Sequence, residues 1–228
     1  IELVNTLGVD FAKIDSFLDD LPPKLKIQLS LKIYMSRYQK VKYLNTKTNS
    51  FITWICPILK LCYFDESQYI YQEGEEVENI YFMLNGEANY VLTRYANTAY
   101  IHIDEGDQFG AIDIICGSYG DFDPLNWMEQ RSKFLRQFTT MAFKMSETLT
   151  MNIEDLSKLQ KEFNTEYNLL FSESKKDLKN ALILKQKASN KCEDQLTKSI
   201  MRGAKVNNCT KEDNANAHSH SHAHSLNL

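Results

Sequence analysis

Hydrophobic residues recur at every third or fourth position through much of residues 1–62, and this spacing predicts helices. Pro22-Pro23 ends a short first helix and opens a second one, because proline is tolerated in a first helical turn. After a polar turn, Ser50 is placed to cap a third helix, in which Pro57 makes a bend. The N-terminal quarter of the chain is therefore expected to be helical.

Between residues 63 and 153 the hydrophobic period changes from four to two, which predicts strands. The expected strands cover residues 69–71, 80–84, 87–92, 98–103, 138–142 and 149–153. Asn85-Gly86 is the strongest local hairpin signal, because a tight hairpin turn needs positive φ at both residues. Gly74 and Gly106 mark further structural turns. Short strands joined by glycine turns predict an antiparallel β-roll of the jelly-roll or barrel kind.

The last third of the chain returns to helical spacing up to residue 200, with Lys and Glu between the apolar positions. Residues 201–228 are polar and low in complexity, so we predict a disordered, His-rich tail. The predicted organisation is helices over 1–62, a β-roll with C-terminal helices over 63–200, and the tail over 201–228. The fold class is α+β.

The composition and charge of the chain exclude some classes of function. The chain has 228 residues, a net charge of −4 and a pI near 5.8, which argues against a dedicated nucleic-acid-binding protein with a basic face. Its five cysteines form no CxxC pair, so we expect reduced thiols in an intracellular protein, with disulfides or a zinc site as the alternatives. No apolar run approaches the roughly 18–20 residues of a membrane span. Because the first residue is Ile1 rather than Met, we expect a fragment of a longer protein.

The predicted roll carries few side chains suited to catalysis. His102 is its single histidine, whereas metal enzymes on jelly rolls need two or three histidines with a carboxylate. The other four histidines alternate in the tail, where they either chelate zinc or nickel loosely or reflect compositional drift. We therefore expect no enzyme, no catalytic residues and no metal site.

The segment 104–116, DEGDQFGAIDIIC, is typical of a turn that opens a short helix near Phe109-Gly110. The first N–H groups of a helix have no partner within it and lie at the positive end of its dipole, so they suit an anion. A glycine at this point lets a ligand approach the backbone closely. The segment is the best candidate for a binding site in the chain.

Five motifs in consistent order resemble the C-linker helices and cyclic nucleotide-binding domain of cyclic-nucleotide-regulated and voltage-gated cation channels. They are LPPKL at 21–25, Phe51 with Leu59-Lys60, IYQEGE at 70–75, IYFMLNG at 80–86, and GDQFG at 106–110. This family includes hyperpolarisation-activated, cyclic nucleotide-gated and ether-à-go-go channels. The same domain occurs in kinase regulatory subunits. The resemblance implies that the helices after residue 155 either pack against the roll or also close over a ligand.

The resemblance also implies a set of site residues. In the family, a glutamate after Phe-Gly binds the ribose 2′-hydroxyl and a later arginine binds the cyclic phosphate. Arg136 falls on that arginine, although it could instead be a solvated loop residue. For Phe109, a core position is favoured over a ligand contact. The candidate site residues are Phe109, Gly110, Ala111, Ile112, Arg136 and Gln137.

Several positions depart from the family pattern. Ala111 stands in place of the glutamate, Gln137 in place of a hydroxyl residue, and Phe138 in place of a small alanine that leaves room in the pocket. Asp113 could partly substitute for the glutamate, although a different helical position usually points in another direction. The resemblance therefore implies cAMP or cGMP as the ligand, with binding weakened or lost.

The resulting hypothesis is the cytosolic regulatory region of a tetrameric cation channel, with potassium as the expected ion. It would form a homotetramer through the C-linker helices, at the cytoplasmic face of a membrane and downstream of a transmembrane region. The alternative is a soluble cyclic nucleotide-binding regulatory or scaffold protein like a kinase regulatory subunit. That class usually has two tandem rolls, whereas one is predicted in this sequence.

Overall fold

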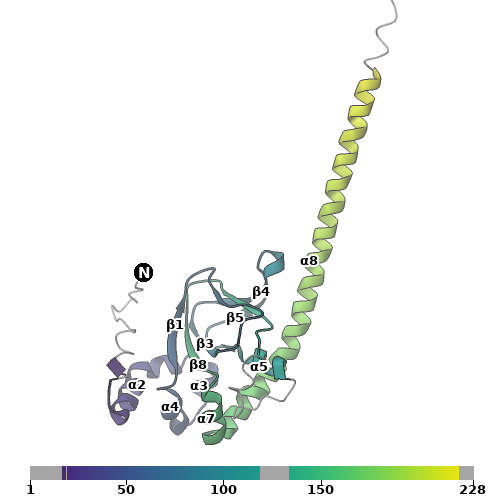
Figure 1. Ribbon diagram of the computed structural model, residues 1–228. Coiled ribbons are helices and arrows are strands. Elements are labelled where there is room, and N and C mark those ends of the chain that lie inside the picture. The colour runs from purple at the N-terminus through teal and green to yellow at the C-terminus, as the bar shows by residue number, and fades with distance from the viewer. Residues whose placement is uncertain (1–16, 19, 119–133, 221–228) are drawn as a thin grey trace, which may run out of the picture. The chain divides into compact units, whose positions relative to one another are not determined.

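The computed structural model describes residues 17–18, 20–118 and 134–220 (Figure 1). Its helices are α2 (Pro23–Tyr38), α3 (Lys42–Asn45), α4 (Asn49–Ile55), α5 (Ala111–Ser118), α7 (Asp155–Glu162) and α8 (Asn164–His220), with a 3-10 turn η1 (Thr93–Tyr95). Its strands are β1 (Lys60–Phe64), β2 (Tyr69–Tyr71), β3 (Asn79–Asn85), β4 (Ala88–Leu92), β5 (Thr98–Ile103), β6 (Gln108–Phe109), β7 (Thr139–Ala142) and β8 (Ser146–Asn152). The chain divides into two compact units, residues 1–184 and 185–228.

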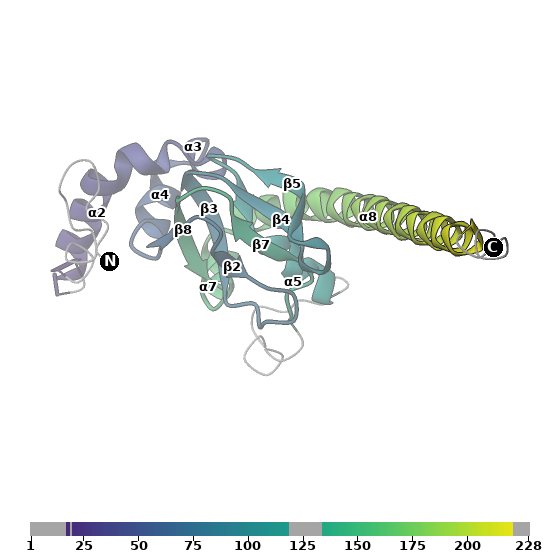
Figure 2. The same cartoon turned by 90° about the horizontal axis from the view of Figure 1, so that it is seen from above.

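The strands form two four-stranded antiparallel sheets. Sheet A has the order β1-β8-β3-β6 and sheet B the order β2-β7-β4-β5. Figure 2 shows β5, β4, β7 and β2 following one another across sheet B. This arrangement confirms the predicted antiparallel β-roll with flanking helices and the α+β fold class.

The Asn85-Gly86 turn does not join two paired strands, so the hairpin prediction is wrong. β3 pairs with β8 and β6 in sheet A, whereas β4 pairs with β5 and β7 in sheet B. Gly86 has a φ of 93°, but Asn85 is not among the described non-glycine residues with positive φ. A type I′ turn needs positive φ at both positions. The chain therefore uses this turn to pass from one sheet to the other.

The helix around residue 50 begins and ends earlier than predicted. The side chain of Thr48, and not that of Ser50, accepts a hydrogen bond from the backbone N–H of Phe51 at 3.3 Å. Helix α4 ends at Ile55, so Pro57 lies beyond it and makes no bend within it. The sequence analysis also missed β1 and the two-residue β6, whose backbones are held by strands distant in sequence.

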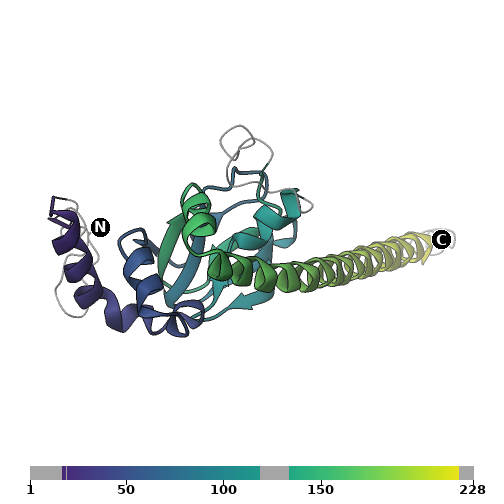
Figure 3. The same ribbon diagram turned by 90° about the horizontal axis from the view of Figure 1, so that it is seen from below.

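The C-terminal helices include part of the predicted tail. α7 and the first turns of α8 lie across one end of the roll (Figure 3). Helix α8 continues to His220, where the composition predicted disorder from residue 201, and a proline-free stretch permits such a continuation. The residues after 220 lie outside the described ranges. The predicted domain boundaries at 62 and 200 stay predictions. No described helix combines the length and apolar character needed to cross a bilayer.

The end of α2 and the start of α3 each contact the roll. Arg37 Nη1 lies 2.8 Å from Oε1 of the largely buried Glu147 on β8. A few residues on, the backbone N–H of Lys42 donates to the carbonyl of Gly106 at 3.0 Å. Because Gly106 belongs to the segment leading into α5, this second contact brings the start of α3 to the edge of the candidate site.

Candidate functional site

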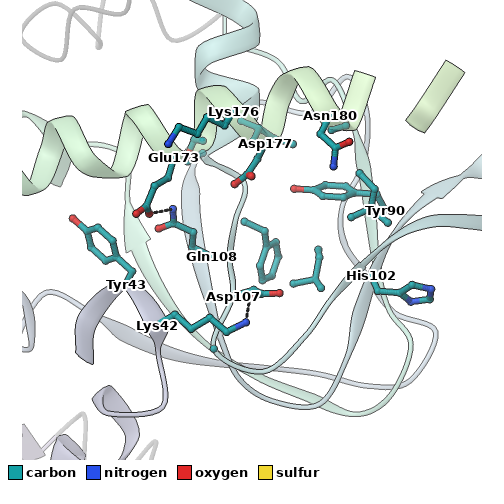
Figure 4. Close-up of a pocket in the computed structure, with 18 residues that line it drawn as sticks. Lys42, Tyr43, Tyr90, His102, Asp107, Gln108, Glu173, Lys176, Asp177 and Asn180 are labelled. Carbon is teal, nitrogen blue, oxygen red and sulfur yellow. Dashed lines mark hydrogen bonds and ion pairs between the residues drawn. The ribbon is translucent and has the colours of Figure 1, made fainter. Parts of the chain in front are cut away.

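A cavity of about 490 Å³ lies between sheet B and the start of α8, on the side where α5 begins (Figure 4). Its walls are β4 and β5, the segment from Ile103 to Ile112, the first residues of α3, and the stretch of α8 from Glu173 to Ala181. All of these belong to the first compact unit. A cavity of this size, at the meeting point of several elements, suits a small organic ligand.

One side of the cavity is apolar and aromatic, and the other is polar. Tyr90, Ile101 and Phe109 supply the apolar side. Phe109 is 3% exposed, and its ring stacks on that of Tyr81 with centroids 5.1 Å apart. Phe109 is thus both a core residue and part of the cavity wall. The polar side chains come mainly from the β5–β6 turn and from α8 (Figure 4).

The turn into α5 is built around Gly110. Its φ is +87°, a conformation that residues with a side chain rarely adopt. A Cβ at this position would lie 3.0 Å from Arg136 Nη1 and 3.2 Å from a ring carbon of Tyr81. Both the backbone conformation and the close approach of the guanidinium therefore require glycine. The next two residues, Ala111 and Ile112, are buried and line the cavity.

Arg136 does not line the cavity. Its side chain is 1% exposed and lies inside the roll, behind the start of α5. Nη1 donates to the carbonyl of Gly110 at 2.9 Å and to Asp113 Oδ2 at 3.1 Å, and Nη2 donates to the carbonyl of Asn79 at 2.7 Å. The guanidinium also lies 3.9 Å from the ring centroid of Tyr71. It is neither a solvated loop arginine nor an exposed cavity cation.

Asp113 is the charged partner of this arginine. It is fully buried on α5, and its Oδ1 accepts the backbone N–H of Gln137 at 2.7 Å. Burial raises the pKa of Asp113 to about 6, against the opposing effect of the nearby Arg136 charge. The carboxylate points at Arg136 and Gln137, so it cannot replace a glutamate that faces the cavity.

Comparison with known proteins adds a second line of evidence. No family model matches the chain. It is 27% identical over 114 residues to cyclic nucleotide-gated ion channel 11 of Arabidopsis thaliana, covering 50% of this chain and 17% of the channel. It is 24% identical over 149 residues to the "Probable cyclic nucleotide-gated ion channel 3" of the same plant, covering 62% of this chain and 19% of that protein. The chain is thus similar to cyclic nucleotide-gated channels over half or more of its own length.

The chain therefore spans less than a fifth of the length of these two channels. Among solved structures, the regulatory subunit of a cAMP-independent protein kinase A from Trypanosoma brucei has a TM-score of 0.48 and 16% identity. That match covers 65% of this chain and 47% of the other. The resemblance read from the five sequence motifs is confirmed by the two channel relatives.

The structure brings together some residues of the predicted nucleotide site and separates others. Phe109, Ala111 and Ile112 line the cavity, whereas Arg136 and Gln137 do not. Phe138, which was expected to narrow the pocket, is buried in the core against Tyr90 with ring centroids 5.5 Å apart. The turn glycine Gly106 also lines the cavity. The turn glycine Gly74 does not line the cavity, and its N–H donates to the Arg136 carbonyl at 2.9 Å.

The sequence did not predict that several other residues would line the cavity. Glu173, Asp177 and Asn180 follow one another at helical spacing on α8, so one face of the helix presents all three to the cavity. That spacing was visible, but nothing in the sequence showed which element the face would meet. Lys42 reaches the cavity from α3.

The cavity wall carries more carboxylates than ammonium groups, with Asp107, Glu173 and Asp177 against Lys42 and Lys176. The exposed Lys42 ammonium is paired with the carboxylate of Asp107 at 2.5 Å, and Glu173 accepts a hydrogen bond from Gln108 at 3.3 Å. Partial burial, together with the neighbouring Glu173 and Asp107 carboxylates, raises the pKa of Asp177. Burial is the largest cause of this shift, the two like charges add to it, and the nearby Lys176 ammonium opposes it.

Proposed function

We propose that the chain is the cytosolic regulatory region of a tetrameric cation channel, with potassium as the expected ion, and that nucleotide binding by its roll is weakened or lost. The two channel relatives and the C-linker motif before the roll support this assignment. The chain would follow a transmembrane region, lie at the cytoplasmic face of the membrane, and assemble as a homotetramer through its N-terminal helices.

A single observation supports the loss of binding most strongly: the arginine expected to hold the phosphate is already bound inside the protein. Arg136 makes three hydrogen bonds within the roll and does not line the cavity. For a nucleotide to use it, the guanidinium would have to leave Asp113 and cross the start of α5. That rearrangement would leave a buried carboxylate without its charged partner.

The rest of the cavity does not compensate for this arrangement. Ala111 offers no acceptor for a ribose hydroxyl, and Lys42 is paired with Asp107. The other cavity lysine, Lys176, lines the cavity together with the carboxylates of Glu173 and Asp177. A hydrogen bond to a charged group is worth about 1.5–3 kcal/mol, so losing two of them weakens binding by roughly a hundredfold or more. Regulation would then depend on the position of α2 relative to the roll and would need no messenger.

Calorimetric titration of the full chain with cAMP and with cGMP tests the proposed loss of binding. We expect no saturable heat up to about 1 mM of either nucleotide. Dissociation constants of about 10 µM or lower would contradict it. The channel assignment has a separate test in the full-length transcript, because the absence of apolar spans upstream of Ile1 would favour the soluble regulatory alternative instead.

A further inference from the structure

Two N–H donors from consecutive residues converge on one buried carboxylate. Arg136 Nη1 lies 3.1 Å from Asp113 Oδ2, and the backbone nitrogen of Gln137 lies 2.7 Å from Oδ1. Each carboxylate oxygen thus has its own donor. The arginine side chain is 1% exposed and the aspartate side chain 0%, so both charges are removed from water.

A guanidinium next to a backbone N–H that points the same way is an arrangement that binds oxyanions in general, including carboxylates and phosphates. Both donors belong to the residues just before β7, whereas Asp113 lies on α5, 23 positions earlier than Arg136. The donors and the acceptor therefore come from separate elements. The segment before β7 forms the oxyanion site, and α5 supplies the Asp113 carboxylate that occupies it.

We propose that Asp113 is an internal anion that occupies an oxyanion site formed by Arg136 and Gln137, and that removing its carboxylate opens this site to a small external oxyanion such as formate. The inference deepens the proposed loss of nucleotide binding, because it names the group that takes the place of a ligand phosphate. Its biological meaning rests on the proposed loss of nucleotide binding, whereas its chemical content does not.

The guanidinium is held by groups other than Asp113, so the site should persist without the carboxylate. The carbonyls of Gly110 and Asn79 accept from its two terminal nitrogens at 2.9 and 2.7 Å. The Tyr71 ring covers one face of the guanidinium at 3.9 Å. Since Ile112, the residue before Asp113, lines the cavity, the oxyanion site lies just behind the cavity wall.

The test is chemical rescue of Asp113→Ala in the full chain, which removes the carboxylate and leaves a space the size of formate. Removing one partner of a buried pair should lower the melting temperature by roughly 10 °C. We expect sodium formate at about 0.5 M to recover at least half of that loss, and sodium chloride of equal ionic strength to recover little. Equal effects of formate and chloride would overturn the proposal.

Two variants serve as matched controls. Asp113→Asn keeps the space filled with an amide, so formate should give it no more stability than chloride does. Asp107→Ala removes a carboxylate from the cavity wall whose partner Lys42 is exposed, and it too should show no specific gain from formate. A formate gain as large in Asp107→Ala as in Asp113→Ala would show a general salt effect and refute the internal-anion role.

If Asp113→Ala does not fold in chloride, refolding from urea in formate provides the same test. Recovery of the folded state in formate and not in chloride supports the proposal, and recovery in neither refutes it. No nucleotide enters these measurements. The wild-type titration with cAMP and cGMP therefore succeeds or fails independently of them.

Discussion

At the scale of single residues, the site depends on one buried ion pair and the glycine beside it. Arg136 and Asp113 form an ion pair inside the roll, and Gly110 provides both the backbone turn and the room for the guanidinium. The sequence singled out Arg136 and Gly110 as candidate phosphate-binding positions, and that role stays a prediction. It could not show that the partner of Arg136 would be Asp113 and not a ligand, because nothing local links residues 23 positions apart.

Gly110→Ala should destabilise the protein by about 1–3 kcal/mol, because its φ of +87° disfavours a side chain and the new Cβ would lie 3.0 Å from Arg136 Nη1. Gly74→Ala is the matched control, since its φ is +93° but no atom lies within 4 Å of the added Cβ. Urea unfolding of both variants measures the difference. Equal losses of unfolding free energy in the two variants would mean that the space beside Arg136 can accommodate a Cβ at position 110.

The Asp113 carboxyl should give stability a distinct pH dependence. Its pKa in the folded protein is about 6, above the ordinary 3.8, so the folded state binds the proton more tightly than the unfolded state does. Its contribution to stability is therefore fully present below about pH 4 and declines as the pH rises to about 6, by about 2–3 kcal/mol in total. The charged and titratable groups that interact with it are Arg136, Tyr71, Tyr90 and Tyr100.

Unfolding free energies of the wild type and Asp113→Asn, compared from pH 4 to pH 7, isolate this contribution because the variant cannot titrate at that position. The difference, wild type minus variant, should fall across the window. A difference that stays constant, or that rises with pH, would show that the carboxyl is not held at a raised pKa.

At the scale of elements, the strands were more predictable than their partners. The pattern of alternating apolar residues located β2 and β5 at the bounds that the structure has, since each is a short run bounded by turn residues. Pairing was less predictable. Asn85-Gly86 reports only a local reversal of the chain, whereas β3 pairs with β6 and β8, and β4 pairs with the following strand β5 and with the distant β7. The sequence also did not predict that the polar face of α8 lines the cavity, because it does not show which distant element a helix face will meet.

The start of α4 provides an element-scale prediction. Thr48→Ala should lower the free energy of unfolding by about 1 kcal/mol, because it removes the acceptor of the Phe51 N–H. Ser50→Ala, at the position that the sequence pattern favoured, should change stability by less than about 0.5 kcal/mol. Chemical denaturation compares the two variants, and a larger loss in Ser50→Ala would reverse the assignment of the cap.

At the scale of the whole molecule, the first compact unit joins helices and roll around the cavity. Arg37 connects α2 to Glu147 in sheet A, and Lys42 connects α3 to Gly106 and Asp107 at the cavity edge. In the proposed channel, these contacts would link the N-terminal helices to the roll directly. A displacement of the turn at Gly106 would then move the end of α2 with no nucleotide present.

The central claim is that the arginine expected to bind the phosphate is held by the protein's own carboxylate. The most direct test is an experimental structure of the full chain determined in the presence of millimolar cAMP. The account predicts Arg136 still hydrogen-bonded to Asp113 and no nucleotide in the cavity beside Phe109. A cAMP molecule in that cavity, with the Arg136 guanidinium turned away from Asp113 onto its phosphate, would contradict the account.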